Sequence, residues 1–223
     1  MSRRTILLIV CVLFSAGCGD DKTAGNGAGP IGGGYGYGGY GQPNPAQTQF
    51  NDNATTNGDV NVPLTEMKFS DLDGQPKQLQ DLLGERNLVV VLVRGKAIEG
   101  GVPCPYCSTQ TSRLITNYDK FKERNAEVVV IYPLAAGRNK NELPQFLKHS
   151  KQQLQQPGAE TPFPVWLDID LAVVNQLGLQ AELAKPTTYI LDKQGRVRFA
   201  YVGAHMADRP SIKAMLAQLD SLK

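Results

Sequence analysis

Cys104 and Cys107 enclose the sequence Cys-Pro-Tyr-Cys, the part of the chain whose residue types and spacing are best suited to chemistry. Two thiols separated by two residues can bind a metal, form a static disulfide or exchange electrons with other molecules. Only the thiolate is a strong nucleophile, so the surroundings of each sulfur atom decide which of the two reacts first.

A metal site is the first alternative, and the sequence argues against it. Such a site needs about four ligands, of which Cys104 and Cys107 supply two. Beyond its N-terminal segment the chain adds only His149 and His205, and neither lies in a motif with ligand spacing. A static disulfide that closes so short a loop would remove little conformational entropy from the unfolded chain. Redox chemistry is therefore favoured, and neither a metal nor a cofactor is expected.

The elements that must position the pair are a buried strand and a helix. Residues 88–93 form a continuous apolar run typical of a buried strand, and apolar residues recur at helical spacing over 107–121. Pro105 suits the first helical position, which places Cys104 at the N-cap. A thiolate at an N-cap can accept hydrogen bonds from free amides and lies at the positive end of the helix dipole. We therefore predict that Cys104 is the exposed, attacking thiol and that Cys107, one turn on, is shielded and resolves the mixed disulfide.

The remainder of the domain alternates strands and helices. Apolar patterns predict strands at 126–134, 162–168 (short and edge-like), 187–192 and 196–203, the last two joined by a hairpin turn at 193–195. They predict helices at 139–156 (interrupted near Pro144), 171–179 and 208–222, and residues 68–84 contain a turn at Asp73-Gly74 and a short helix. This order predicts one α/β domain over 63–223, with a central mixed sheet flanked by helices.

The first 62 residues have a different character. Residues 1–17 combine two arginines, an apolar run of about nine residues and three small residues, which predicts a signal peptide that is too short to span a membrane. Cys18 follows at once, and the segment resembles a bacterial lipoprotein signal, in which this cysteine receives diacylglycerol. Ser15 stands where such signals usually have leucine, so cleavage as an ordinary signal remains the alternative. We expect an exported protein, lipid-anchored in the cell membrane and facing the periplasm or the exterior.

Residues 18–62 are rich in glycine and asparagine and almost lack aliphatic side chains. Such a segment cannot bury enough surface to offset its ordering entropy, so a disordered, Gly-rich tether is predicted. The net charge is +2 with both signs interspersed, which gives no indication of a nucleic-acid partner.

Residues 64–222 resemble the thioredoxin-like superfamily, in particular its redoxin branch of AhpC/TSA, or peroxiredoxin-like, proteins. The resemblance is carried by five stretches: FSDLDGQPKQLQDLLG at 69–84, VRG at 93–95, CPYC at 104–107, KPTTYILD at 185–192, and YVG at 201–203 together with DRP at 208–210.

The resemblance implies a thioredoxin-like fold and a membrane-tethered thiol-disulfide oxidoreductase that exchanges disulfides through the Cys-Pro-Tyr-Cys pair. It implies that Pro186 is cis and that Pro186 and Thr187 shape a groove for an extended partner chain. Arg94 would give electrostatic support. The expected partners are protein thiols or disulfides and an upstream redox protein, while the redox direction is left open.

Two alternatives remain. Peroxiredoxins typically carry Pro-x-x-x-Thr/Ser-x-x-Cys, whereas Gly101 and Ala97 stand three and seven residues before Cys104, and residues 96–103 form an apparent insertion. A peroxiredoxin-like thiol peroxidase is therefore the second interpretation. A copper-handling chaperone that pairs the thiols with a histidine such as His205 is a minor third.

Two arginines bear on the peroxidase alternative, because a cation can stabilise the hydroxide that leaves a peroxide. Arg94 precedes the insertion, and a flexible insertion would displace Arg94 from the site. Arg209 is predicted at the start of the closing helix, distant from the cysteines. Neither is expected to complete a peroxide pocket.

Overall fold

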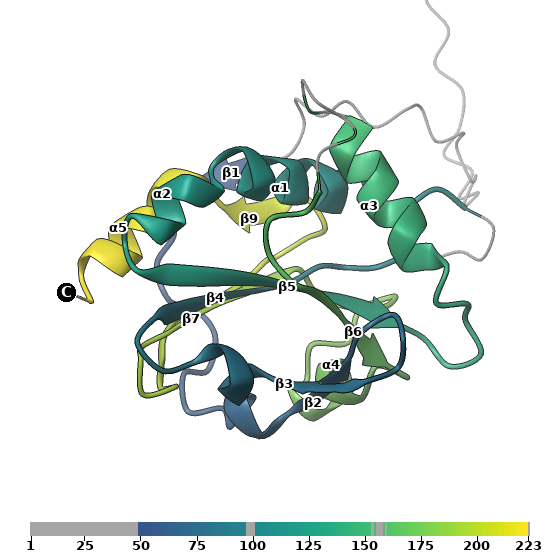
Figure 1. The fold of residues 1–223 in the computed structure, drawn as a ribbon, viewed down its shortest axis with the longest axis horizontal. Helices are drawn as coiled ribbons and strands as arrows, with labels where there is room; N and C mark the ends of the chain where they lie inside the picture. The colour runs from purple at the N-terminus through teal and green to yellow at the C-terminus, as the bar shows by residue number, and fades with distance from the viewer. Residues whose placement is uncertain (1–48, 97–100, 153, 155–157, 159, 223) are drawn as a thin grey trace, which may run out of the picture. The chain divides into compact units, whose positions relative to one another are not determined.

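The computed structural model describes residues 49–222, apart from 97–100, 153, 155–157 and 159 (Figure 1). The predicted signal peptide, Cys18 and the greater part of the predicted tether lie outside these residues.

A seven-stranded mixed sheet forms the centre of the domain, as the sequence predicts. Its strand order is β3-β2-β6-β5-β4-β7-β8, with β4, β5 and β6 parallel to one another and the other pairings antiparallel. The strands are β2 (Lys68–Ser70), β3 (Pro76–Gln78), β4 (Asn87–Leu92), β5 (Ala126–Leu134), β6 (Val165–Ile169), β7 (Thr187–Leu191) and β8 (Val197–Val202).

Helices cover both faces of the sheet. Figure 1 shows α1, α2, α3 and α5 above it and α4 below. Val89 and Val91 of β4 belong to the apolar cluster under the upper helices, and Leu88, Val90 and Leu92 belong to the cluster on the α4 side. Successive side chains of a strand point to opposite faces of the sheet, so β4 packs against both clusters. Because both of its faces are buried, β4 is apolar throughout. The helices are η2 (Leu64–Glu66), η3 (Leu79–Leu82), α1 (Pro105–Thr116), α2 (Tyr118–Lys122), α3 (Glu142–Gln152), α4 (Ala172–Gln176) and α5 (Ile212–Asp220).

Several elements differ from the sequence prediction, among them α3, which runs without interruption through Pro144 from Glu142 to Gln152. β6 is not edge-like, since it lies between β5 and β2. The helix that follows the cysteines ends at Thr116, and a separate helix begins at Tyr118. The closing helix begins at Ile212 instead of residue 208, because its N-cap is Ser211, whose hydroxyl accepts a hydrogen bond from the Ala214 amide at 3.0 Å.

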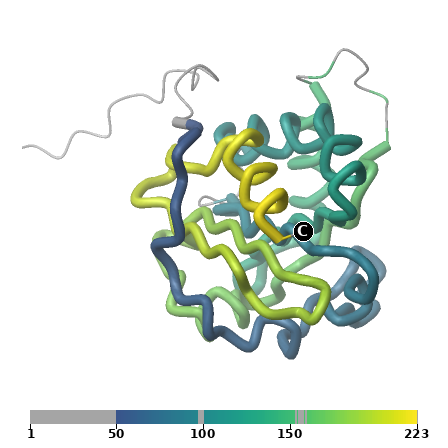
Figure 2. Tube along the Cα trace, turned by 90° about the vertical axis from the view of Figure 1, so that its left-hand side faces the viewer, coloured from purple at the N-terminus to yellow at the C-terminus, as the bar shows by residue number. Residues whose placement is uncertain are grey.

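The segment before the predicted domain boundary is part of the fold. β1 (Gln49–Asn51) pairs in parallel with β9 (Asp208–Pro210), and Figure 2 shows this segment, in dark blue, beside the yellow C-terminal part of the chain. Ala54 is buried, and the Asn57 amide donates to the Ala200 carbonyl at 2.9 Å. Residues 49–62 therefore belong to the folded domain, and the predicted boundary at 63 wrongly assigns them to the tether, because backbone pairing fixes this polar segment.

Within the described part of the chain, no helix combines the length and apolar character that spanning a bilayer requires.

Candidate active site

Cys104 occupies the N-cap of α1, and Pro105 its first position, as the sequence predicts. The Cys104 sulfur accepts a hydrogen bond from the Cys107 amide at 3.3 Å, which satisfies one of the free amides of the first turn. Both cysteines are reduced, and both belong to the apolar cluster beneath the helices. Cys104 is 7% exposed and Cys107 is fully buried. The expectation of an exposed Cys104 is therefore wrong, whereas Cys107 is shielded as expected.

The Cys107 sulfur lies among hydrogen-bond donors. The backbone amide of Arg94, just beyond the end of β4, donates to it at 3.3 Å. The guanidinium of Arg209 donates through Nη2 at 3.2 Å. A sulfur that receives two N–H donors, one of them charged, is stabilised as the anion.

Arg209 is held in place by contacts on every nitrogen of its guanidinium. Its side chain is fully buried, Nε donates to Oε1 of Gln110 at 2.8 Å, and Nη1 donates to the Met206 carbonyl. The prediction that Arg209 begins a distal helix is wrong, because residues 208–210 form the extended strand β9, which carries the side chain to α1. Gln110 was not predicted from the sequence. The sequence feature that could have identified Gln110 is its spacing: it is a polar residue three positions after Cys107, on the same face of the helix.

The surroundings of the two thiols shift their pKa values in opposite directions. The hydrogen bond with Cys107, together with burial, raises the pKa of Cys104 well above its ordinary value. Burial opposes ionisation of Cys107 as well, but the hydrogen bond from Cys104 and the charge of Arg209 lower the pKa of Cys107 to about 6. The donors thus favour Cys107 as the thiolate, whereas the sequence analysis assigns the attack to Cys104.

Arg94 lies at the site in a different way from the one expected. Its backbone amide contacts the Cys107 sulfur, while its guanidinium forms an ion pair with Glu182. The predicted electrostatic support thus comes from the peptide group. Of the predicted insertion, residues 97–100 lie outside the described residues, and the Lys96 carbonyl accepts a hydrogen bond from Arg138 at 3.3 Å.

Pro186 and Thr187 do not form the expected groove. No peptide bond among the described residues is cis, so the bond before Pro186 is trans, the isomer favoured by about 0.5–1 kcal/mol before proline. The Pro186 carbonyl accepts from the Gly203 amide at 2.8 Å, and the Thr187 hydroxyl donates to the Lys185 carbonyl at 3.0 Å. Both side chains are buried, so neither presents an exposed wall to a docking chain.

The metal alternative finds no support in the described residues, which contain no cluster of three or more histidine, cysteine and acidic side chains. His205, the suggested third ligand of a copper site, lies in the turn before β9, where its Nδ1 accepts from the Ala207 amide at 3.3 Å.

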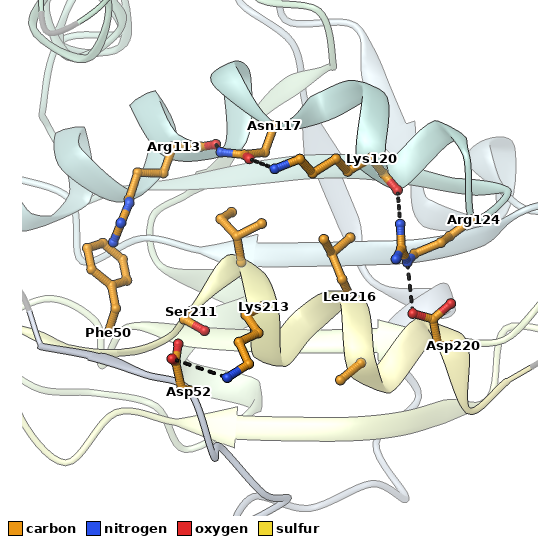
Figure 3. A pocket seen from close by; sticks show the side chains of 12 residues that line it. Phe50, Asp52, Arg113, Asn117, Lys120, Arg124, Ser211, Lys213, Leu216 and Asp220 are labelled. Atoms are coloured by element: carbon orange, nitrogen blue, oxygen red, sulfur yellow. Dashed lines mark hydrogen bonds and ion pairs between the residues drawn. The ribbon is translucent and has the colours of Figure 1, made fainter.

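A groove of about 800 Å³ lies between β1, α1, α2 and α5 (Figure 3). Cations predominate among its charged residues, and neither cysteine is part of its lining. The lining residues are Phe50, Asp52, Arg113, Asn117, Lys120, Arg124, Ser211, Ile212, Lys213, Leu216, Ala217 and Asp220.

Comparisons with known proteins agree with the observed fold. The family model described as AhpC/TSA family matches residues 60–200. The chain is similar in structure to peroxidoxin BcpB from Mycobacterium tuberculosis, with a TM-score of 0.56 and 19% identity over 76% of this chain and 99% of that one. It is also similar to peroxiredoxin Q from Xanthomonas campestris, with a TM-score of 0.52 and 16% identity over 77% and 98% of the two chains.

A third similar structure is the mitochondrial 2-Cys peroxiredoxin from Plasmodium falciparum, with a TM-score of 0.51 and 17% identity over 69% of this chain and 86% of that one. No curated protein matches the sequence significantly. At these identities the three structures establish a shared fold.

Proposed function

Because the chain belongs to the AhpC/TSA family, whose members are thiol-based redox enzymes, we propose that it is a peroxiredoxin-like thiol peroxidase in which Cys107 attacks the peroxide. One observation carries the proposal: Nη2 of Arg209 lies 3.2 Å from the sulfur of a fully buried Cys107. The same guanidinium that stabilises the thiolate can stabilise the negative charge that develops on the departing oxygen.

The burial of Cys107 favours a small substrate. Attack on a disulfide requires the attacking sulfur and the two substrate sulfurs to approach one line, with the bulky carbon substituents projecting beside it, which a fully buried sulfur does not allow for a protein disulfide. Hydrogen peroxide and the head of an alkyl hydroperoxide are two oxygen atoms. They need a far smaller opening than a protein disulfide does. They can reach Cys107 past Cys104, which is 7% exposed.

The peroxiredoxin pattern changes when it is counted from Cys107. The position three residues earlier, typically threonine or serine, is then Cys104, and the position seven residues earlier, typically proline, is Gly100. A thiol is a weaker hydrogen-bond donor than a hydroxyl, yet at this position it can still donate to the peroxide. It can also attack the sulfenic acid that forms on Cys107. This departure makes Cys104 both a neighbour of the peroxide and the second redox centre.

The proposed reaction has three steps. The Cys107 thiolate attacks one peroxide oxygen, the O–O bond breaks, and the products are a sulfenic acid on Cys107 and a hydroxide or alkoxide that takes up a proton. The Cys104 thiol then attacks the sulfenic sulfur, which forms the Cys104–Cys107 disulfide and releases water. An external dithiol reduces this disulfide and is itself oxidised to a disulfide.

Thiol–disulfide exchange, placed first by the sequence, is the second candidate. The observation in its favour is that Cys104 is the less buried thiol and that its sulfur, at an N-cap, accepts the Cys107 amide. In this case Cys104 would attack a partner disulfide and Cys107 would resolve it, with protein thiols and an upstream redox protein as partners.

Single-turnover measurements on the reduced full chain separate the two candidates. We expect Cys104→Ser to form a sulfenic acid on Cys107 with one equivalent of hydrogen peroxide, trapped by dimedone and located by fragmentation mass spectrometry. Cys107→Ser should form none. The peroxidase proposal fails if Cys107→Ser keeps the peroxide reaction, or if the reduced protein reacts faster with a model protein disulfide than with hydrogen or cumene hydroperoxide.

We also propose that the mature protein is exported and lipid-anchored at Cys18. The support is the order of charged, apolar and small residues over 2–17 followed directly by cysteine. The Gly-rich stretch between Cys18 and β1 would then act as a spacer between the membrane and the redox domain.

A further inference from the structure

One face of α1 holds both strands of the small β1–β9 ribbon. Cys107, Gln110 and Arg113 recur at three-residue spacing and so lie along the same side of the helix. The first two contact Arg209 of β9. The third contacts β1, because the guanidinium carbon of Arg113 lies 4.2 Å from the centroid of the Phe50 ring, as Figure 3 shows.

The ribbon joins these two contacts through its backbone. Phe50 and Arg209 are directly paired residues in the register of β1 and β9. The next residue, Asn51, accepts a hydrogen bond through its carbonyl from the Ser211 amide at 2.9 Å. Its side chain also donates to the hydroxyl of Tyr201 at 3.4 Å, and that hydroxyl donates to Asp208 at 2.6 Å. Asp208, directly before Arg209, is thus held to β8, and Ser211, two residues after Arg209, is held to β1.

β9 has little support of its own. It is three residues long, and within the described residues its strand partner is β1, in a two-stranded sheet separate from the central one. An isolated two-stranded ribbon of this size is marginally stable in water. Its position against α1 therefore depends on the side chains that fasten it, and Phe50 is the aromatic one on the β1 side.

We propose that Phe50 is a positioning residue, which acts through the β1–β9 ribbon to hold the Arg209 guanidinium against the Cys107 sulfur. The chain immediately before the predicted domain is then part of the redox machinery, and its attachment to Arg113 sets how firmly the cation is held. This inference rests on the proposed role of Cys107 as the thiolate.

The pKa of Cys107 depends on how close the Arg209 guanidinium lies to its sulfur. This pKa can be measured by alkylation, without an assay of peroxidase activity. The titratable and charged groups around the Cys107 sulfur are Cys104, Arg209 and Tyr132 of β5, whose pKa burial raises above its ordinary range. Replacing Cys104 with serine removes the coupled thiol. The pH dependence of iodoacetamide alkylation in that full-chain background, measured at Cys107 by fragmentation mass spectrometry, then follows the thiolate.

The variants form matched sets. Phe50→Ala and Arg113→Met each remove one half of the contact between β1 and α1, and Phe50→Tyr keeps the aromatic ring. The control is Arg124→Met, which removes another arginine of the same groove, paired with Asp220 and the Lys120 carbonyl. We expect Phe50→Ala and Arg113→Met to raise the pKa of Cys107 by about 0.5–1 pH unit, the scale of a weakened charged hydrogen bond. Phe50→Tyr and Arg124→Met should leave it within about 0.2 pH unit of the parent.

The outcomes separate the positioning role from the proposed function. If Arg209→Met raises the pKa of Cys107 while Phe50→Ala and Arg113→Met do not, the ribbon does not position the cation and the inference is overturned. If Arg209→Met has no effect, the thiolate assignment itself is wrong. An equal rise in Arg124→Met would mean that the groove acts only through its total charge, which also overturns the inference. Should Phe50→Ala not fold, Arg113→Met and Phe50→Leu make the same comparison.

Discussion

The guanidinium of Arg209 lies 3.2 Å from the sulfur of Cys107, although 102 residues separate the two in the chain. The arginine is fully buried, and a buried cation is costly unless it is paired. In the described residues its hydrogen-bond partners are an amide oxygen, a backbone carbonyl and this sulfur, with no carboxylate among them. An ionised Cys107 would supply the balancing negative charge, so each group favours the charged state of the other.

Removing the cation should therefore weaken the nucleophile. We expect Arg209→Met to raise the pKa of Cys107 by about 1–2 pH units, because a hydrogen bond to a charged group contributes about 1.5–3 kcal/mol. The second-order rate with hydrogen peroxide at pH 7 should fall by about ten-fold or more, since a smaller fraction is ionised and the leaving oxygen loses its donor. Arg209→Lys should retain part of the rate. Stopped-flow measurement of both variants tests this, and an unchanged rate in Arg209→Met would contradict it.

The rate of the peroxide reaction should increase as the pH rises through the lowered pKa of the Cys107 thiol. With the pKa of Cys107 at about 6, the thiolate is present above that pH and is lost as the pH falls through it. The rate of the wild-type protein should rise between about pH 5 and 7 and then level off. A rate that keeps rising to pH 9 would instead indicate a thiol with its ordinary pKa.

The sequence predicts the scaffold well because local patterns determine it. The apolar run of β4, Pro105 at the first position of α1 and the 193–195 turn between β7 and β8 each fix an element through nearby residues. The same patterns place Cys104 at the N-cap. The fold class and the location of the redox pair could therefore be predicted.

The roles of the two thiols could not be predicted in this way. The roles that we propose depend on Arg209, whose strand at residues 208–210 pairs with β1, a three-residue strand in polar sequence without an apolar signal. The apolar spacing that predicts a helix from 208 continues through α5 and conceals the short strand before it. Burial of Cys104 likewise results from tertiary packing, because its side chain belongs to the apolar cluster beneath the helices.

Gly203 is a position where the packing around β9 can be tested. A Cβ atom at this residue would lie 2.5 Å from the Asp208 carbonyl oxygen and 2.9 Å from Cγ of Pro186. The backbone oxygen cannot move without displacing β9, so we expect Gly203→Ala to reduce the free energy of unfolding by about 1–3 kcal/mol and to slow the peroxide reaction. Gly158→Ala is the control, because no atom of the described residues lies within 4 Å of its added Cβ. Urea unfolding compares the two, and equal stabilities would refute the expectation.

The anchoring proposal makes a prediction about where the protein is found in the cell. Cys18 follows directly after the small residues of the predicted signal peptide, which is the position at which a lipoprotein cysteine is acylated. Two acyl chains bind a bilayer far more firmly than one, so the wild-type protein should sediment with the membrane fraction even in high salt.

Cys18→Ala removes the acylated thiol and should shift the protein to the soluble fraction or leave the precursor unprocessed. Cys11→Ala, which changes a cysteine inside the apolar run, is the matched control and should remain membrane-bound. Fractionation followed by intact-mass measurement of the mature N-terminus distinguishes the two, and a Cys18→Ala protein that is processed normally and still sediments with membranes would show that the anchor lies elsewhere.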